Sequence, residues 1–353
     1  MNKQFLNFSH DLALAHDCER YTPPLNVQMM EHDLAELVNL LPQTQICYSE
    51  YAPVWGWNRS FVNKLKGLPG LPTDKQLADI RRLSSRRTAV EMLPAIRKQL
   101  PEGTTIGESW FVKNEQDWEN AQCIKGNYRR MIFKAPYSGS GRGLRLVDRD
   151  ELGSQNVKVH KSQGGVVVEP YYSGKVADFA LEYLCTPSEV SFLGLSLFST
   201  DERNVYSGNV IAPQSVLWQR LNNVVLSFDF EQLINVVKKE LACRFIGHYL
   251  GPIGVDMMIV QGEERSAKYY IHPCVEVNVR RTMGELSLHL LSLLAEGAEG
   301  FFRLIYNKDS DTLRRMVDDM PTAEYDNDGR LVSGVHLLTP LAEDTHFVAL
   351  LTV

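Results

Sequence analysis

Two spacings of apolar residues divide the chain into predicted helices and predicted strands. Apolar positions recur at helical spacing from Asn26 until Pro42 and again over residues 229–250, which predicts two amphipathic helices. Short apolar runs bounded by turn residues predict strands, and residues 1–25 predict a first strand that leads into a polar loop. Further strands are expected at 45–51, 108–112, 130–134, 165–169, 176–183, 189–199, 254–260 and within 334–351, and further helices at 115–122, 285–294 and 310–317.

A segment rich in glycine and proline, GLPGLPTDKQ at residues 67–76, is the clearest linker in the chain. Thr73 or Asp74 can cap the helix that follows it, and Ser84 and Ser85 offer a second start within that helix. The linker predicts a domain boundary near residue 75.

The composition is that of an ordinary globular protein, with 44% of the 353 residues hydrophobic and 23% charged. This length predicts about two or three domains. The net charge of -6 and the pI near 5.9 argue against a protein whose main ligand is a nucleic acid or an anionic membrane. The six cysteines show no Cys-x-x-Cys spacing, so we expect reduced and mostly buried thiols. No apolar run reaches membrane-spanning length, which predicts a soluble cytoplasmic protein.

Residues suited to a metal-nucleotide lie in YYIHPCVEVNVRRTMG, residues 269–284. This segment begins as an apolar run and then places Glu276, Asn278 and Arg280 at alternate positions, which face the same side of a strand. Mg²⁺ takes oxygen ligands and few carboxylates beside phosphates, and arginine can bind an anion at two points. Alternating polar residues also mark the wet face of many sheets, so this pattern alone leaves both interpretations open.

A glycine-rich loop, PYSGSGRGL at residues 136–144, follows the predicted strand 130–134. Its backbone N–H groups can surround an anion, and Lys134 would add a positive charge beside them. The loop is not a Walker A motif, because no Gly-Lys-Ser/Thr follows, and it lacks the Gly-x-Gly-x-x-Gly spacing of a dinucleotide site. A tight hairpin is the alternative explanation.

Two other apolar runs each carry one acidic residue. In GVVVEPYY, residues 165–172, Pro170 ends the strand after Glu169 and is expected to free the backbone around Tyr171 for a purine edge, with Glu169 accepting from the purine amino group. In GVDMMIV, residues 254–260, Asp256 is the one charged residue. A carboxylate in such a place requires a cation or a hydrogen-bond partner.

Three other conspicuous groups have structural explanations. The aromatic segment YAPVWGW at 51–57 favours packing. A solvated helix face explains the most basic cluster better than a phosphate contact does, and its members are Arg81, Arg82, Arg86 and Arg87. The third group lies near the end of the predicted first strand and consists of His10, Asp11 and His16. A substrate contact is one interpretation of this group, but lone histidines are more often structural.

Taken in order, Lys134 with its glycine-rich loop, VVVEPYY, GVDMMIV and EVNVRRTMG resemble the ATP-grasp superfamily, which includes D-alanine:D-alanine ligase, glutathione synthetase and biotin carboxylase. The resemblance covers roughly residues 80–300. It implies an α+β fold in which two α+β subdomains, residues 76–170 and 171–353, grip ATP. Residues 1–75 would be the α/β domain that precedes the ATP-grasp unit.

The resemblance also implies how ATP is bound. Lys134 would hold the α- and β-phosphates, and Glu169 with the backbone of Tyr171 and Tyr172 would bind adenine. The family often has an acidic residue on the ribose, for which Asp178 is the nearest candidate. The lid over the terminal phosphates would be formed by Ser138, Gly139, Ser140, Gly141 and Gly143.

The remaining implied roles concern the metal and the reacting acid. Asp256 and Glu276 would share one Mg²⁺, or Mn²⁺ in its place, and Glu276 and Asn278 would share a second. Arg280 would lie near the acid, with Arg281 as its substitute. The chain departs from the family in having Arg86 or Arg87 where a second lysine is usual, and Gly254 where D-alanine ligases have a basic residue.

The activity implied is that of an ATP- and Mg²⁺-dependent ligase, which activates a carboxylate as an acyl phosphate for attack by an amine or a similar nucleophile. Lys134 and Arg280 would stabilise the charge of the transferred phosphoryl group. A small-molecule kinase acting on a hydroxyl and a non-catalytic nucleotide-binding protein are the alternatives. The expected partners are small-molecule carboxylate and amine substrates, with no nucleic acid and no membrane, and a homodimer is common in the family.

Overall fold

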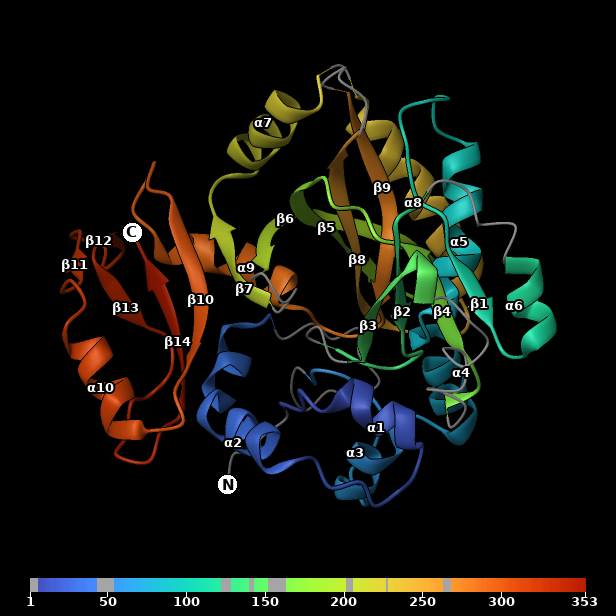
Figure 1. The fold of residues 1–353 in the computed structure, drawn as a ribbon. Helices are drawn as coiled ribbons and strands as arrows, with labels where there is room; N and C mark the ends of the chain where they lie inside the picture. The colour runs from blue at the N-terminus through green and yellow to red at the C-terminus, as the bar shows by residue number, and fades with distance from the viewer. Residues whose placement is uncertain are drawn as a thin grey trace.

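Two antiparallel sheets organise the chain in a computed structural model, which describes residues 6–42, 54–121, 128–139, 143–151, 163–200, 206–226, 228–262 and 268–353 (Figure 1). The smaller sheet has four strands and the larger has eight, with a short two-stranded ribbon of β11 (Glu324–Tyr325) and β12 (Leu331–Ser333) beside them. Helices and strands occur together in each half, so the prediction of a mixed α+β chain is confirmed.

The small sheet has the order β1-β4-β2-β3, formed by Trp110–Val112, Val166–Pro170, Arg130–Lys134 and Leu144–Asp148. Phe133 pairs with Val168, and both side chains are buried in a core that includes Trp118 of α6 (Glu115–Ala121). Because side chains alternate along a strand, Lys134 and Glu169 fall on the opposite face. This sheet therefore separates an apolar face from a polar one.

The large sheet has the same division of faces. Its order is β13-β14-β10-β7-β6-β5-β8-β9, and the strands span Val335–Leu337, Phe347–Thr352, Gly300–Tyr306, Tyr206–Ile211, Val190–Thr200, Lys175–Cys185, Gly251–Gln261 and Tyr269–Asn278. One face of β5 and β8 packs in a common core with helices α5 (Arg87–Lys98) and α8 (Phe230–Phe245). Leu181 and Val255 are fully buried there, whereas Glu182 and Asp256 alternate with them on the other face.

Short helices precede the sheets: α1 (His10–His16), α2 (Leu25–Asp33), α3 (Arg59–Lys64), α4 (Asp74–Ser84) and the 3-10 helix η1 (Ala35–Leu40), and Figure 1 shows the first of them in blue, below the sheets. The prediction of a strand and loop over residues 1–25 is wrong for the stretch that forms α1. The predicted helix from Asn26 is divided at Leu34, and the predicted strand at 45–51 lies outside the described residues.

Local signals were reliable where a cap or an apolar run dominates. Thr73 caps α4 in a capping box with Gln76, and the helix ends at Ser84 before α5 begins, as the paired serines predicted. The predicted C-terminal helices are α9 (Met283–Leu290), followed by the 3-10 turn η5 (Leu291–Leu293), and α10 (Ser310–Asp318).

Three elements of the large-sheet half were not predicted, namely α7 (Gln214–Val224), β7 and β10. In β7, Gly208 and Asn209 are residue types that strands usually avoid. Asn209 is tolerated because its amide nitrogen donates to the carbonyl of Leu197 on β6, a partner that is distant in sequence. Tertiary hydrogen bonding therefore overrides local preference there.

Two expectations about the whole chain can be compared with the described residues. Within them, no helix is both long and apolar enough to cross a bilayer. The described cysteines are free, but only Cys185 and Cys274 are buried, whereas Cys18 and Cys243 are exposed. The expectation of mostly buried thiols is therefore only half met, while Cys47 and Cys123 lie outside the described residues.

The shared core predicts that Phe245 of α8, which is fully buried, is required for stability. Phe245→Ala should lower the free energy of unfolding by about 3–5 kcal/mol, because the lost ring leaves a cavity between α8 and the sheet. Leu226→Ala, at a side chain that is 78% exposed, should change it by less than about 0.5 kcal/mol. Urea unfolding of both variants provides the comparison, and equal losses would contradict this assignment of the core.

Candidate active site

The centre of the candidate site is a pair of carboxylates on neighbouring strands. Asp256 of β8 and Glu276 of β9 are direct partners in the antiparallel ladder, and Gly254 pairs with Asn278 in the same way. Partner side chains project from the same face. Asn278 Nδ2 donates to Asp256 Oδ2 at 3.0 Å. The fold thus brings together the three residues that were predicted to be metal ligands.

Burial and the neighbouring carboxylate make Asp256 expensive to ionise. Burial, together with the charge of Glu276, raises the pKa of Asp256 to about 7. Asp256 forms no ion pair within the described part of the chain. Nor do the described residues contain a group of three or more His, Cys, Asp or Glu side chains that could hold a metal by themselves. The carboxylates therefore form an open acidic site that lacks a full set of protein ligands.

Arg86, at the start of α5, joins this acidic site to the glycine-rich loop. Its Nη2 lies 2.9 Å from Glu276 Oε1 and donates to the Ser138 carbonyl at 2.8 Å. Its Nη1 donates to the Ala135 carbonyl at 2.7 Å and to the Ser138 hydroxyl. The solvated-face explanation of the basic cluster is wrong for Arg86, which is only 5% exposed, whereas the exposed Arg87 pairs with Glu91 on the surface of α5.

The small sheet contributes a second buried ion pair. Lys134 Nζ lies 2.5 Å from Glu169 Oε2, and the Ser109 hydroxyl donates to the other oxygen of Glu169 at 3.0 Å. His272 of β9 lies near the segment that follows β4, because its ring is 5.9 Å from that of Tyr172. Burial, followed by the charges of Lys134 and Arg97, lowers the pKa of His272 to about 3.

The residues predicted to bind adenine are only partly available. The amide of Tyr171 donates to the carbonyl of Arg130 at 3.0 Å, so the expectation that Pro170 frees this amide is wrong. The Tyr172 ring packs edge-on against His272, with ring centroids 5.9 Å apart. Asp178 lies on the same face as Asp256 and accepts hydrogen bonds from Lys175 at 2.7 Å and Thr200 at 3.0 Å. A role for these residues in nucleotide binding stays a prediction.

The described part of the glycine-rich loop is closed by backbone geometry. The Ala135 amide donates to the Gly143 carbonyl at 2.9 Å, and Gly143 has φ 69°, a conformation that glycine adopts without strain. At Gly139, a Cβ atom would lie 2.7 Å from Asp11 Oδ2, so the loop approaches helix α1 closely. Ser140 and Gly141 lie outside the described residues.

Arg280 pairs with the N-terminal helix. Its Nη2 and Nε donate to Asp11 Oδ2 at 2.9 and 3.2 Å. Burial opposes ionisation of both groups, but their facing charges lower the pKa of Asp11 and raise that of Arg280. Arg281 does not substitute for Arg280, because it is fully buried in an ion pair with Glu285 and points to a different part of the fold.

Sequence reasoning missed Glu182, a buried carboxyl on the face that carries Asp256. It accepts hydrogen bonds from the hydroxyls of Thr282 at 2.9 Å and Ser196 at 3.2 Å. Burial, followed by the charge of Asp256, raises the pKa of Glu182 to about 8. Asp256 was predicted because it is the one charged residue of an apolar run, whereas the strand of Glu182 also contains Asp178, which was the residue considered there. His10 and His16 have structural contacts, with Asn58 and Tyr21 respectively.

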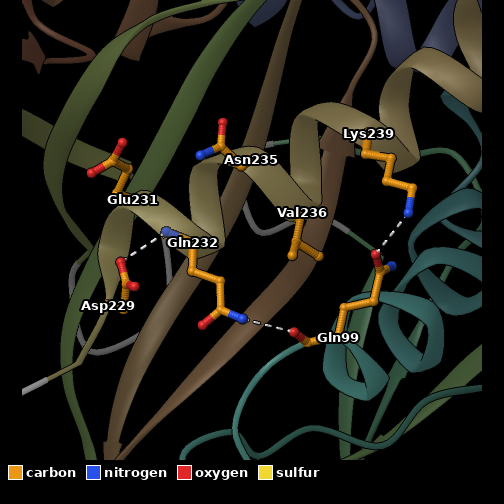
Figure 2. A pocket seen from close by; sticks show the side chains of 7 residues that line it. All are labelled: Gln99, Asp229, Glu231, Gln232, Asn235, Val236 and Lys239. Carbon is orange, nitrogen blue, oxygen red and sulfur yellow. Dashed lines mark hydrogen bonds between the residues drawn. The ribbon is translucent and has the colours of Figure 1, made fainter.

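A surface hollow of about 410 Å³ lies apart from this site, between the end of α5 and the start of α8 (Figure 2). Gln99, Gln232 and Lys239 are among the side chains that line it, and Gln232 Nε2 donates to the Gln99 carbonyl at 3.1 Å. Helix α8 covers the apolar face of the large sheet, opposite the face that carries Asp256. None of the predicted site residues lines this hollow.

No protein-family model and no curated protein sequence matches the chain. Solved structures that resemble it include the following three. N5-carboxyaminoimidazole synthetase from Staphylococcus aureus complexed with ADP is 15% identical, with TM-score 0.48 over 83% of this chain and 72% of that chain. Carboxyaminoimidazole ribonucleotide synthase from Aspergillus clavatus complexed with ATP is 14% identical, with TM-score 0.48 over 83% and 74%. A biotin carboxylase-ATP complex from Campylobacter jejuni is 14% identical, with TM-score 0.47 over 78% and 63%.

The raised pKa of Glu182 predicts a stability that falls as pH rises. Between the ordinary glutamate pKa of about 4.3 and the folded value of about 8, the folded protein retains a proton that the unfolded chain has lost. Stability should therefore decrease from about pH 5 to about pH 8, by on the order of 1.4 kcal/mol for each unit of the pKa difference. Glu182→Gln, which is neutral at every pH, should show a clearly smaller decrease.

Urea unfolding in EDTA at several pH values measures this difference. Glu231→Gln, at an exposed carboxylate on α8, serves as the control and should follow the wild-type pH profile. A Glu182→Gln profile as steep as that of the wild type would show that Glu182 is not protonated in the folded protein.

Proposed function

We propose that the protein is an enzyme that binds a nucleoside triphosphate with a divalent cation and transfers its terminal phosphoryl group. The observation that carries this proposal is the pairing of Asp256 with Glu276 across β8 and β9, with Asn278 beside them. Arg86 forms an ion pair with Glu276, the charges of both carboxylates act on Arg280, and Lys134 is a third cation, on the small sheet. Carboxylates next to several cations suit a metal-bound nucleotide. The carboxylates would bind the metal ion, and the metal ion and the cationic side chains would bind the phosphates.

More specifically, we propose an ATP-grasp ligase that joins a carboxylic acid to an amine. The order of Lys134, the glycine-rich loop, Glu169, Asp256 and the Glu276–Arg280 segment supports this class, and Arg86 links the start of that loop to Glu276. The acid would be activated as an acyl phosphate and then captured by the amine. The proposed partners are these two small molecules, and a homodimer remains part of the proposal.

The residues present fit Mg²⁺ accompanying the nucleotide better than a permanent metal centre. Mg²⁺ is commonly held by one or two carboxylates together with substrate phosphates and water, and Asp256 and Glu276 supply that number. Arg86 pairs with Glu276, whereas Asp256 forms no ion pair within the described residues, and burial with the charge of Glu276 raises the pKa of Asp256 to about 7. When bound, Mg²⁺ would neutralise phosphate charge, and Asp256, Glu276 and Asn278 would hold it. Mn²⁺ suits the same oxygen ligands.

The remaining roles, which are phosphate binding and orientation of the acid, are assigned to other residues of the chain. Lys134, at the end of β2, would bind the inner phosphates, and the backbone of the glycine-rich loop would surround the outer ones. Arg280 would orient the acid, although its pairing with Asp11 reduces the net positive charge that it offers to the phosphoryl group. No side chain is assigned as a general base, since an amine that arrives neutral needs none for attack on an acyl phosphate.

Glu276→Gln should weaken binding of a non-hydrolysable ATP analogue in Mg²⁺ by roughly ten-fold or more, which is about 1.4 kcal/mol. The reason is the loss of a carboxylate ligand to the metal. In EDTA the variant should bind the analogue at least as tightly as the wild type, because without a metal Glu276 only repels phosphate and occupies Arg86. Isothermal titration measures both, with Glu231→Gln as the exposed control. Equal weakening with and without Mg²⁺ would contradict the metal role.

Incubation with Mg-ATP, candidate carboxylic acids and hydroxylamine tests the reaction type. A ligase should yield a hydroxamate, because hydroxylamine captures the acyl phosphate in place of the amine. Lys134→Met should abolish the product by removing the phosphate-binding charge. A stable phosphate ester formed with a hydroxyl substrate, and no hydroxamate, would instead identify a kinase. Nucleotide binding with no turnover would identify a non-catalytic binding protein.

A further inference from the structure

Arg86 holds two segments that are separated by much of the sequence. Besides its side-chain contacts to Ala135 and Ser138, its backbone amide donates to the Pro136 carbonyl at 3.0 Å. The same guanidinium forms the ion pair with Glu276 on β9, at 2.9 Å. One buried side chain therefore ties the start of the glycine-rich loop to a predicted metal ligand.

The two ends of this bridge differ in how firmly they are held. The loop end uses three side-chain hydrogen bonds and the backbone amide, and three of the four acceptors are carbonyl oxygens. At the Glu276 end only Nη2 takes part, at 2.9 and 3.0 Å from the two carboxylate oxygens, and the Glu276 side chain is 25% exposed, against 5% for Arg86. Arg86 also retains a buried Nε that has no hydrogen-bond partner among the described residues. If Arg86 exchanges one of its contacts for a ligand, the geometry favours loss of the contact with Glu276.

Glu276 has two competing uses. As the partner of Arg86 it neutralises a buried cation, and as a metal ligand it would direct its oxygens to a divalent ion instead. Removal of an ion-pair partner leaves a buried charge uncompensated, which is costly unless another group replaces it. A phosphate oxygen is a suitable replacement, because guanidinium groups bind carboxylate and phosphate with the same fork.

We propose that Arg86 is a positioning residue that exchanges Glu276 for phosphate. This inference rests on the proposed function. In the free protein Arg86 bridges Glu276 and Ser138. When Glu276 ligates a divalent cation, Arg86 gives up that carboxylate, stays bound to Ala135 and Ser138, and offers the freed Nη2 to the nucleotide. The glycine-rich loop is thereby kept in register with the metal site in both states.

The exchange predicts opposite effects on two ligands. Arg86→Gln removes the competitor for Glu276, so Mn²⁺ alone should bind at least about three-fold more tightly than to the wild type. The same variant lacks the phosphate donor, so Mg²⁺ with a non-hydrolysable ATP analogue should bind roughly ten-fold more weakly. Electron paramagnetic resonance of free Mn²⁺ measures the first affinity, and isothermal titration measures the second.

Three comparison variants separate the exchange from simpler effects. Arg87→Gln, at the exposed neighbour, should change neither affinity. Arg280→Gln removes a charge close to Glu276 but leaves the ion pair between Arg86 and Glu276 intact. It should therefore raise Mn²⁺ affinity less than Arg86→Gln does. Arg86→Lys keeps the positive charge but lacks the two-pronged guanidinium. Both of its affinities should fall between those of the wild type and Arg86→Gln. This variant also provides a folded comparison if Arg86→Gln is unstable.

Each outcome bears on the inference. Mn²⁺ binding to the Arg86 variants that is no tighter than to the wild type would overturn the exchange, while the proposed function stands if the wild type binds the Mg²⁺ nucleotide. Equal gains for Arg280→Gln and Arg86→Gln would reduce the effect to general charge and also overturn it. A wild-type protein that does not bind the Mg²⁺ nucleotide would overturn the proposed function, and the exchange with it.

Discussion

The repulsion between Asp256 and Glu276 is the constraint on which the rest of the site depends. Two carboxylates at partner positions in a sheet destabilise the fold unless positive charge or protons compensate them. The register of β8 and β9 fixes them side by side, and the alternation of side chains keeps both out of the apolar core. The fold therefore carries one carboxylate, Asp256, that no ion pair within the described residues neutralises.

The surrounding cations are arranged around that constraint but are not free. Lys134 pairs with Glu169, Arg86 with Glu276, and Arg280 with Asp11. Each ion pair joins different segments of the chain. Because each of these cations is matched by one carboxylate, the site is close to neutral, and Asp256 is the carboxylate without a cationic partner among the described residues. Such an arrangement lowers the cost of burying charge before any ligand arrives. It also means that a polyanionic ligand must compete with internal carboxylates for its contacts.

Small residues make room for the buried carboxyl that supports this face. A Cβ atom at Gly284 would lie 2.0 Å from Glu182 Oε1, and one at Gly254 would lie 2.9 Å from Oε2. Glu182 in turn accepts from Thr282, the cap of α9, and so ties the segment after β9 to β5. A side chain at Gly254 would therefore collide with Glu182 and with Thr282.

The sequence by itself determined the two-faced strands, the caps, and the types of residue that face away from the core, because alternation and capping are local properties. It predicted Glu276 and Asn278 as candidate ligands from a strand pattern and Asp256 from one charge in an apolar run, and the structure brings the three side chains together. Only the tertiary structure decided which cation meets which carboxylate. Arg86 and Arg87 are neighbours on one helix, yet one is buried in the site and the other exposed. Asp11 reached the site from a segment expected to be a strand and loop. Partner choice depends on how distant segments pack, and no local spacing records that.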